Sequence, residues 1–136
     1  MVIKYNFLNN INNKKTNSIT VVADNNKNDL LFVGFVMDSL KLEYYLADNG
    51  KTALDLVYEK KPKLVLLNVA MPYLSGVEAN ILIKNDLFTK HISTIAITRL
   101  TEQEHIKAIK NAQFDDYIVK PFTTEDLKIK IRGFIK

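Results

Sequence analysis

The chain has 136 residues, of which 47% are hydrophobic and 25% are charged, a composition that indicates one globular domain with a sizeable core. It has no cysteine, which excludes a disulfide framework, a thiolate metal site and a cysteine nucleophile. The two histidines, His91 and His105, are isolated from each other and leave little for a metal centre or a Ser-His triad. Most familiar catalytic centres are therefore excluded.

The formal net charge of +4 is distributed unevenly along the chain. Residues 1–17 contain three lysines and no acidic residue, whereas residues 18–136 have 16 basic and 15 acidic residues. The nearly neutral remainder argues against a nucleic-acid interface. No apolar run is long enough to span a membrane, and the N-terminus lacks the pattern of a signal peptide. We therefore expect a cytoplasmic protein.

Residues 1–17 are rich in Asn and Lys and show no clear periodicity, so we expect a mobile N-terminal extension that could lie on the domain, followed by one domain over residues 18–136. In this domain, short β-branched segments alternate with longer segments of helical periodicity. Strands are predicted at residues 19–23, 42–47, 64–67, 94–97 and 117–119. Helices are predicted around residues 30–40, 53–58 and 77–85, after a capping box at 101–104, and after a similar pattern at 123–126.

Strict alternation of strands and helices predicts a parallel sheet with helices on both faces. The segment 64–67 is wholly apolar, which is typical of a parallel strand buried on both faces. Five such units fit a flavodoxin-like α/β three-layer sandwich with a five-stranded parallel sheet of order 2-1-3-4-5. In that fold the functional crevice lies at the carboxyl ends of the first and third strands.

Polar residues follow four of the predicted strands at their carboxyl ends. Each has an ordinary structural interpretation, such as a helix cap, a turn residue, a strand end or a solvated charge. Because parallel strands end at the same edge of a sheet, their joint occurrence predicts one shared pocket. The four residues are Asp24, Asn68, Thr98 and Lys120.

Three motifs, in order, resemble those of the receiver domain of bacterial two-component response regulators, the CheY-like superfamily. The segment PKLVLLNVAMP at 62–72, with Gly76 beyond it, is similar to the phosphoacceptor strand and loop. The segment TIAIT at 94–98 is similar to the strand that ends in a hydroxyl residue, and DDYIVKPF at 115–122 to the lysine-proline motif. This resemblance, over residues 18–136, implies a signalling domain that is not an enzyme and has protein partners.

Two positions that are acidic in typical receivers are neutral in this chain. The resemblance places at position 68 an aspartate that accepts a phosphoryl group from a histidine kinase, and two acidic residues that help it hold Mg²⁺ at positions 24 and 25; the chain has Asn68, Asp24 and Asn25. A neutral amide oxygen is a poor nucleophile, so we expect no phosphorylation of Asn68. Asp24 and Lys120 can pair with each other, so we also expect weak or absent Mg²⁺ binding and no other cofactor.

Arg99 follows Thr98 at a place that usually holds a small residue in the family. Its guanidinium could cover the pocket or reach Asp24, or it could instead extend into solvent, and these interpretations stay open. Thr98 and Tyr117 match the pair that rearranges on phosphorylation in ordinary receivers. For this pair we favour the simpler interpretation, in which Tyr117 is an ordinary half-buried aromatic residue.

These observations favour an atypical, stand-alone pseudo-receiver in two-component signal transduction or a phosphorelay, acting by phosphorylation-independent protein-protein interaction. The expected partner is a histidine kinase, a phosphotransfer protein or another regulator. It would bind the first helix and nearby loops, or the face of the fourth helix, fifth strand and last helix, which could also form a homodimer. Two alternatives remain: phosphorylation at another residue, such as Asp24 or Thr98, and nucleic-acid binding through the basic tail and last helix.

Overall fold

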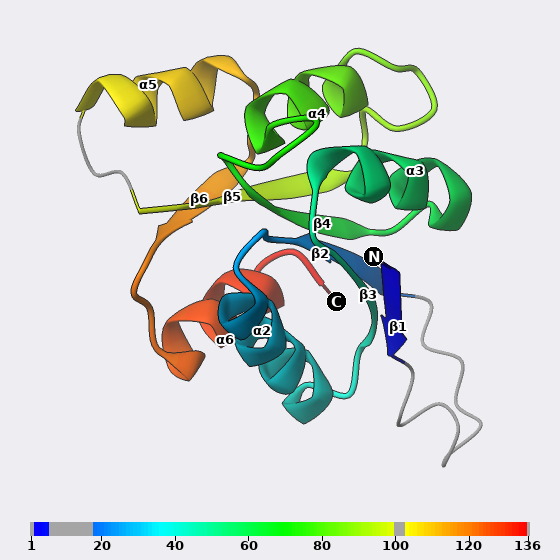
Figure 1. Cartoon of the computed structure of the whole chain (residues 1–136), viewed down its shortest axis with the longest axis vertical. Coiled ribbons are helices and arrows are strands. Elements are labelled where there is room, and N and C mark those ends of the chain that lie inside the picture. Colours follow the sequence, from blue (N-terminus) through cyan, green and yellow to red (C-terminus); the bar gives the residue numbers. More distant parts are fainter. Residues whose placement is uncertain (1, 6–17, 100–102, 136) are drawn as a thin grey trace.

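The computed structural model describes residues 2–5, 18–99 and 103–135. Within these residues one sheet has six strands in the order β1-β3-β2-β4-β5-β6 (Figure 1). The five strands from β2 onward are parallel and, counted from β2, follow the predicted order 2-1-3-4-5, which is confirmed. The strands are β1 (Val2–Tyr5), β2 (Ile19–Ala23), β3 (Glu43–Ala47), β4 (Leu64–Asn68), β5 (Ser93–Thr98) and β6 (Asp116–Val119).

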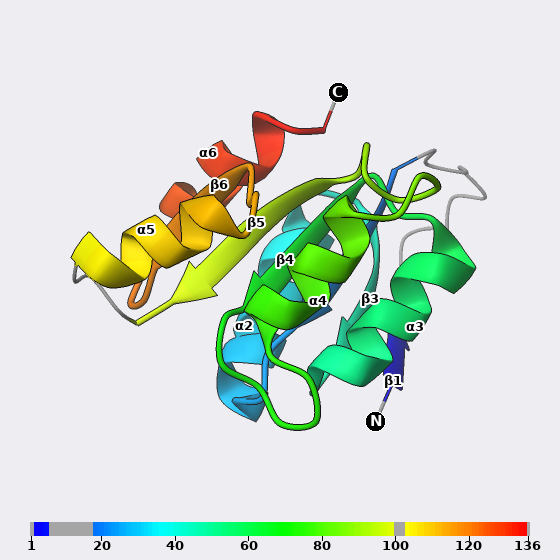
Figure 2. The ribbon, with the colours of Figure 1, turned by 90° about the horizontal axis from the view of Figure 1, so that it is seen from above.

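Five helices in the described part of the chain follow the parallel strands in turn, as predicted. α3, α4 and α5 cover one face of the sheet, and α2 and α6 cover the other (Figures 1 and 2). None of the helices in residues 18–99 and 103–135 has the length and apolar character needed to cross a bilayer. The helices are α2 (Lys27–Ser39), α3 (Gly50–Lys60), α4 (Gly76–Lys84), α5 (Gln103–Asn111) and α6 (Thr124–Arg132).

The central strand β4 shows how the two layers share one sheet. Leu64 and Leu66 pack into the layer of α2 and α6, whereas Val65 and Leu67 pack into the layer of α3, α4 and α5. All four side chains are fully buried. The unbroken apolar run predicted a strand covered on both faces, and the structure confirms this.

Polar side chains cap the N-termini of several helices and fix where those helices begin. Thr123 and Asp126 form the predicted capping box of α6, and Ser75 with Glu78 forms a second box at α4. The box predicted at residues 101–104 involves residues outside the described part of the chain. The caps of α4 and α6 direct these helices away from the carboxyl edge of the sheet, where the candidate site lies.

The strand β1 was not predicted from the sequence. Residues 2–5 belong to the extension that could lie on the domain, and they pair antiparallel with β3, with Val2 opposite Ala47 and Tyr5 opposite Tyr44. Residues 6–17 lie outside the described residues. The strand covers an edge of β3 that the five parallel strands alone would leave open.

Candidate functional site

The four polar residues predicted at the carboxyl edge of the sheet lie there together. Asn68 and Thr98 are the last residues of β4 and β5, one residue beyond the predicted strand ends, and Asp24 and Lys120 directly follow β2 and β6. Asp24 and Thr98 are fully buried, and Lys120 is 8% exposed. The carbonyl oxygen of Thr98 accepts a hydrogen bond from the backbone N–H of Lys120 at 2.7 Å, which helps to orient the lysine toward the edge.

Both carboxylate oxygens of Asp24 face N–H donors. Oδ2 lies 2.6 Å from Nζ of Lys120, which confirms the predicted ion pair. Oδ1 accepts hydrogen bonds from Nδ2 of Asn68 at 2.9 Å and from the backbone N–H of Asn26 at 2.9 Å. Nδ2 of Asn68 also donates to Oδ1 of Asn25 at 3.1 Å. The side chain of Asp24 is therefore held by three residues and does not cap α2, whose N-cap is Asn26.

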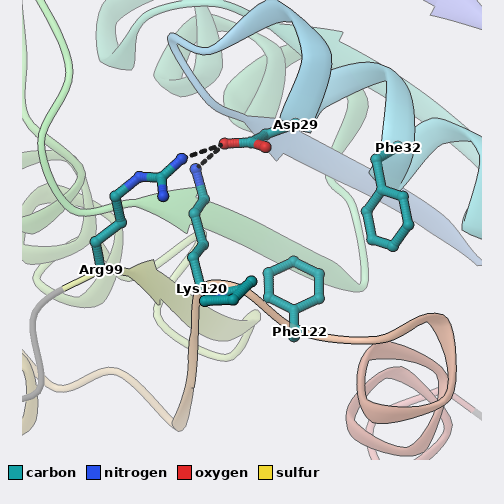
Figure 3. A pocket seen from close by; sticks show the side chains of 6 residues that line it. Asp29, Phe32, Arg99, Lys120 and Phe122 are labelled. Carbon is teal, nitrogen blue, oxygen red and sulfur yellow. Dashed lines mark hydrogen bonds and ion pairs between the residues drawn. The ribbon is translucent and has the colours of Figure 1, made fainter.

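Asp29 belongs to the same cluster, although it was not among the residues predicted from the sequence. It lies in the first turn of α2, and its Oδ2 is 2.7 Å from Nζ of Lys120 and 3.2 Å from a terminal guanidinium nitrogen of Arg99 (Figure 3). An acidic residue in a first turn is normally explained by the helix dipole alone. Only its position in the sequence could have identified Asp29 as a site residue, because the first turn of the helix that follows β2 lies beside the strand ends.

Arg99 reaches Asp29 and not Asp24. Its side chain is 63% exposed even while it makes this ion pair, so it lies at the rim of the cluster and is largely in solvent. Two acidic residues, Asp24 and Asp29, thus face two basic residues, Lys120 and Arg99. The formal charges of the cluster cancel.

A pocket of about 280 Å³ opens beside the cluster (Figure 3). One side of its lining is charged and the other is apolar, with the rings of Phe32 and Phe122 5.9 Å apart between centroids and inclined at 53°. Phe32 comes from α2, and Phe122 from the segment between β6 and α6. The lining residues are Asp29, Phe32, Arg99, Lys120, Pro121 and Phe122.

Tyr117 lies on β6 opposite Ala96 of β5, and Thr98 lies opposite Val119. The half-buried tyrosine packs against the layer of α3, α4 and α5, and its ring centroid is 6.0 Å from Nζ of Lys130. This is the packing of an ordinary half-buried aromatic residue. A two-state role for Thr98 and Tyr117 therefore stays a prediction.

Comparison with known proteins agrees with this architecture. Residues 19–132 match the response regulator receiver domain. The chain is 30% identical over 118 residues to the polar-differentiation response regulator DivK of Brucella anthropi, which covers 87% of this chain and 95% of that protein. It is 29% identical over 128 residues to histidine kinase P4 of Formosa agariphila, which covers 93% of this chain but 9% of the kinase. The structure of the chemotaxis response regulator CheY4 of Vibrio cholerae has a TM-score of 0.82 at 20% identity and covers 88% of this chain and 100% of that chain.

The five parallel strands, with an aspartate, a hydroxyl residue and a lysine at their carboxyl edge, define a CheY-like α/β fold. The chain belongs to the response regulator receiver domain family of two-component signalling. Members of this family are signalling modules rather than typical enzymes, and they interact with histidine kinases and other proteins. Because the chain spans about a tenth of histidine kinase P4, it shares only a receiver-sized segment with that protein.

Proposed function

We propose that the chain is a pseudo-receiver, which acts in two-component signalling by protein-protein interaction and without phosphorylation at position 68. One observation carries this proposal. Asn68 is a hydrogen-bond donor to Asp24, and Lys120 occupies the other oxygen of the same carboxylate. The polar side chains at this edge of the sheet therefore bond to one another, and they do not present free acidic oxygens.

The chemistry of Asn68 supports this proposal. A carboxylate can attack phosphorus and form an acyl phosphate, whereas an amide oxygen is a poor nucleophile. In this chain the amide nitrogen of Asn68 is directed toward Asp24 and Asn25. Phosphoryl transfer to position 68 would therefore lack a nucleophile.

The donor set also does not fit Mg²⁺, the cation that the family implies. Mg²⁺ prefers carboxylate oxygens and bound water in octahedral geometry. Here an ammonium group lies 2.6 Å from Oδ2 of Asp24, and amide N–H groups face Oδ1. Among the described residues no group of three or more acidic or histidine side chains could hold a metal ion. These observations support weak or absent Mg²⁺ binding.

Asp24 and Thr98 are poor alternative phosphoryl acceptors. Both are fully buried, and both oxygens of Asp24 already accept hydrogen bonds. A phosphodonor would have to break the pair between Asp24 and Lys120 before it could reach the carboxylate. No feature of the described residues favours the nucleic-acid alternative over partner binding.

The names of two relatives support a partner from two-component signalling. One is named a response regulator and another a histidine kinase. We therefore infer that this chain binds a histidine kinase, a phosphotransfer protein or another regulator in the cytoplasm. The two candidate surfaces are α2 with the neighbouring loops, and the face of α5, β6 and α6, which could also form a homodimer.

The test restores the two missing carboxylates. Wild type, Asn25→Asp/Asn68→Asp and the matched control Asn28→Asp/Asn111→Asp, which changes two exposed asparagines, are each incubated with acetyl phosphate and Mg²⁺. We expect a mass gain of one phosphoryl group only in Asn25→Asp/Asn68→Asp, because only this variant regains a nucleophile beside acidic ligands.

Phosphorylation of the wild type would contradict the proposal. Absence of phosphorylation in a folded Asn25→Asp/Asn68→Asp variant would show that the two asparagines are not what prevents the reaction. A Mg²⁺ titration of the same three proteins, followed by tyrosine fluorescence, is expected to show specific binding only where phosphorylation is gained.

A further inference from the structure

The loop between α4 and β5, residues 85–92, carries two large apolar side chains on its outer side (Figure 1). Leu87 and Phe88 are 76% and 75% exposed, whereas the polar side chain of the next residue, Thr89, is fully buried. Burial usually follows the opposite pattern, with apolar side chains inside and hydroxyl groups outside. Adjacent exposed apolar residues of this kind mark an interaction site, and we call Leu87 and Phe88 the apolar tip.

Internal hydrogen bonds fix the backbone of this loop. Oδ1 of Asp86 accepts the backbone N–H of Phe88 at 2.8 Å, and its carbonyl oxygen accepts that of Thr89 at 3.2 Å. The hydroxyl of Thr89 donates to the carbonyl oxygen of Ile83 at 2.7 Å. Because these bonds hold Thr89 inside, they hold Leu87 and Phe88 outside. A ligand of the apolar tip therefore does not have to order the loop when it binds.

The apolar tip lies at a cationic edge of the sheet. The strands from β2 to β6 are parallel, so the connections that enter them share the amino edge, opposite the candidate site. The connections before β4 and β5 are neighbours, since the carbonyl oxygen of Lys63 accepts the backbone N–H of Ser93 at 3.4 Å. Exposed lysines in the connections before β3, β4 and β5 form what we call the lysine edge: Lys41, Lys61, Lys63 and Lys90.

Acidic residues around the apolar tip are engaged within the domain. Asp115 lies 2.8 Å from Nζ of Lys84, and Glu59, near the end of α3, lies 3.2 Å from Nζ of Lys60. Asp86 is half-buried and binds the backbone of its own loop. The accessible charge next to the apolar tip is therefore mainly positive, which complements an anionic surface.

We propose that the apolar tip and the lysine edge form a peripheral membrane-binding site, in which Leu87 and Phe88 enter an anionic lipid surface and the lysines contact its headgroups. Burial of apolar side chains and attraction of lysines to anionic lipids act together in such sites, which need no membrane-spanning helix. In this orientation the candidate site at the carboxyl edge faces away from the lipid, so a signalling partner could bind at the same time. The inference goes beyond the proposed function and does not depend on it.

A folded protein partner fits this surface less well. A specific protein interface buries about 800 Å² on each partner around a closely packed apolar centre, and lysine is depleted in it. Here the apolar centre is two adjacent side chains on a loop, with lysines beside them. A fluid lipid surface needs no matching shape, and its anionic headgroups favour lysine.

The first test uses tryptophan as a probe, because the chain has none. Phe88→Trp is compared with Tyr73→Trp, since Tyr73 is 89% exposed but lies between β4 and α4, at the carboxyl edge. Vesicles consist of phosphatidylcholine alone or of an equal mixture with phosphatidylglycerol, with and without brominated acyl chains. With the anionic vesicles we expect a blue shift of the emission and quenching by bromine in Phe88→Trp but not in Tyr73→Trp.

The second test removes the apolar tip. Leu87→Asn/Phe88→Asn is expected to lower the partition coefficient for anionic vesicles about tenfold, measured by vesicle sedimentation, because two apolar side chains no longer leave water. The matched control, Leu31→Asn/Tyr73→Asn, replaces one exposed leucine and one exposed aromatic residue outside the amino edge. It is expected to leave the partition coefficient unchanged.

The third test reverses the charge of the lysine edge. Lys61→Glu/Lys90→Glu is expected to lower the same partition coefficient about tenfold, because two attractive charges become repulsive. The matched control, Lys27→Glu/Lys51→Glu, changes the net charge equally but at exposed positions where α2 and α3 begin, at the carboxyl edge. It is expected to have a much smaller effect. Urea denaturation verifies that all variants are folded.

Failure of the wild type to bind anionic vesicles would overturn the inference. So would equal quenching at positions 88 and 73, equal binding to phosphatidylcholine alone, or a partition coefficient that Leu87→Asn/Phe88→Asn does not change. A blue shift at position 88 that grows with protein concentration without vesicles would assign the apolar tip to contact between two copies, and would also overturn it. None of these outcomes bears on the proposed function, which phosphorylation of the wild type contradicts.

Discussion

Lys120 is the residue on which the stability of the candidate site depends. Its ammonium lies 2.6 Å from Asp24 and 2.7 Å from Asp29, and its side chain is 5% exposed. Asp24 is fully buried, and Lys120 is the one cation paired with it among the described residues. Removing one member of a buried pair leaves an uncompensated charge, which costs far more free energy than losing an exposed pair.

We expect Lys120→Met to lower the free energy of unfolding by about 3 to 5 kcal/mol, measured by urea denaturation at neutral pH, because the buried Asp24 loses its partner. Arg99→Met is the matched control, since Arg99 belongs to the same cluster but is 63% exposed, and it is expected to cost less than about 1 kcal/mol. The double variant Asp24→Asn/Lys120→Met should recover much of the loss. Equal losses in Lys120→Met and Arg99→Met would contradict this assignment.

At the scale of the elements, the segment between β4 and α4 is positioned by two close backbone approaches. A Cβ at Gly76 would lie 2.0 Å from the carbonyl oxygen of Asn68, and a Cβ at Gly50 would lie 1.8 Å from that of Leu74. Only glycine fits these distances. The starts of α3 and α4 thus hold the segment that follows Asn68 and, with it, the orientation of the asparagine.

Gly76→Ala is expected to lower the free energy of unfolding by about 1 to 3 kcal/mol, because the methyl group must displace backbone. Gly34→Ala, inside α2, is the matched control: its Cβ would meet the ring of Tyr44 at 3.4 Å, and replacing a helical glycine with alanine gains up to about 1 kcal/mol. Urea denaturation measures both.

The NMR signal of the Asn68 side-chain amide gives an independent readout of the same close approach. It should shift in Gly76→Ala and stay unchanged in Gly34→Ala. Similar stability changes in the two variants, with no shift of the Asn68 signal, would show that the approach of Gly76 to Asn68 does not position the site.

At the scale of the whole molecule, β1 closes one edge of the sheet. Its four residues pair with β3 from Tyr44 to Ala47. Uncovered edge strands present unpaired N–H and C=O groups that can pair with other chains. The N-terminal segment therefore protects the parallel sheet at its β3 edge, as far as Ala47 at the carboxyl end of that strand.

Removal of residues 1–17 is expected to leave a folded domain whose β3 amides exchange faster with solvent, because the pairing with β1 is lost. Amides of β6, at the other edge of the sheet, are the internal control and should exchange at the same rate as before. Light scattering should show more self-association of the shortened chain. Unchanged exchange in β3 would mean that β1 does not protect this edge in solution.

The sequence by itself determined the parallel strands and their order, because alternating short apolar runs and amphipathic helices allow few topologies. It also determined which residues meet at the carboxyl edge. Asp24, Asn68, Thr98 and Lys120 each stand at a strand end, so the topology alone brings them together. The pairing of Asp24 with Lys120 followed from charge, since they are the one acid and the one base among these four residues.

Only the tertiary structure decided the place of Asp29, the direction of Arg99 and the exposure of Phe35. Each depends on the angle at which α2 lies on the sheet and on a side-chain rotamer, neither of which periodicity encodes. The strand β1 is a similar case, because a short segment becomes a strand when a free edge is available to pair with it. The free edge belongs to β3, so the composition of residues 2–5 alone does not predict that they pair with it.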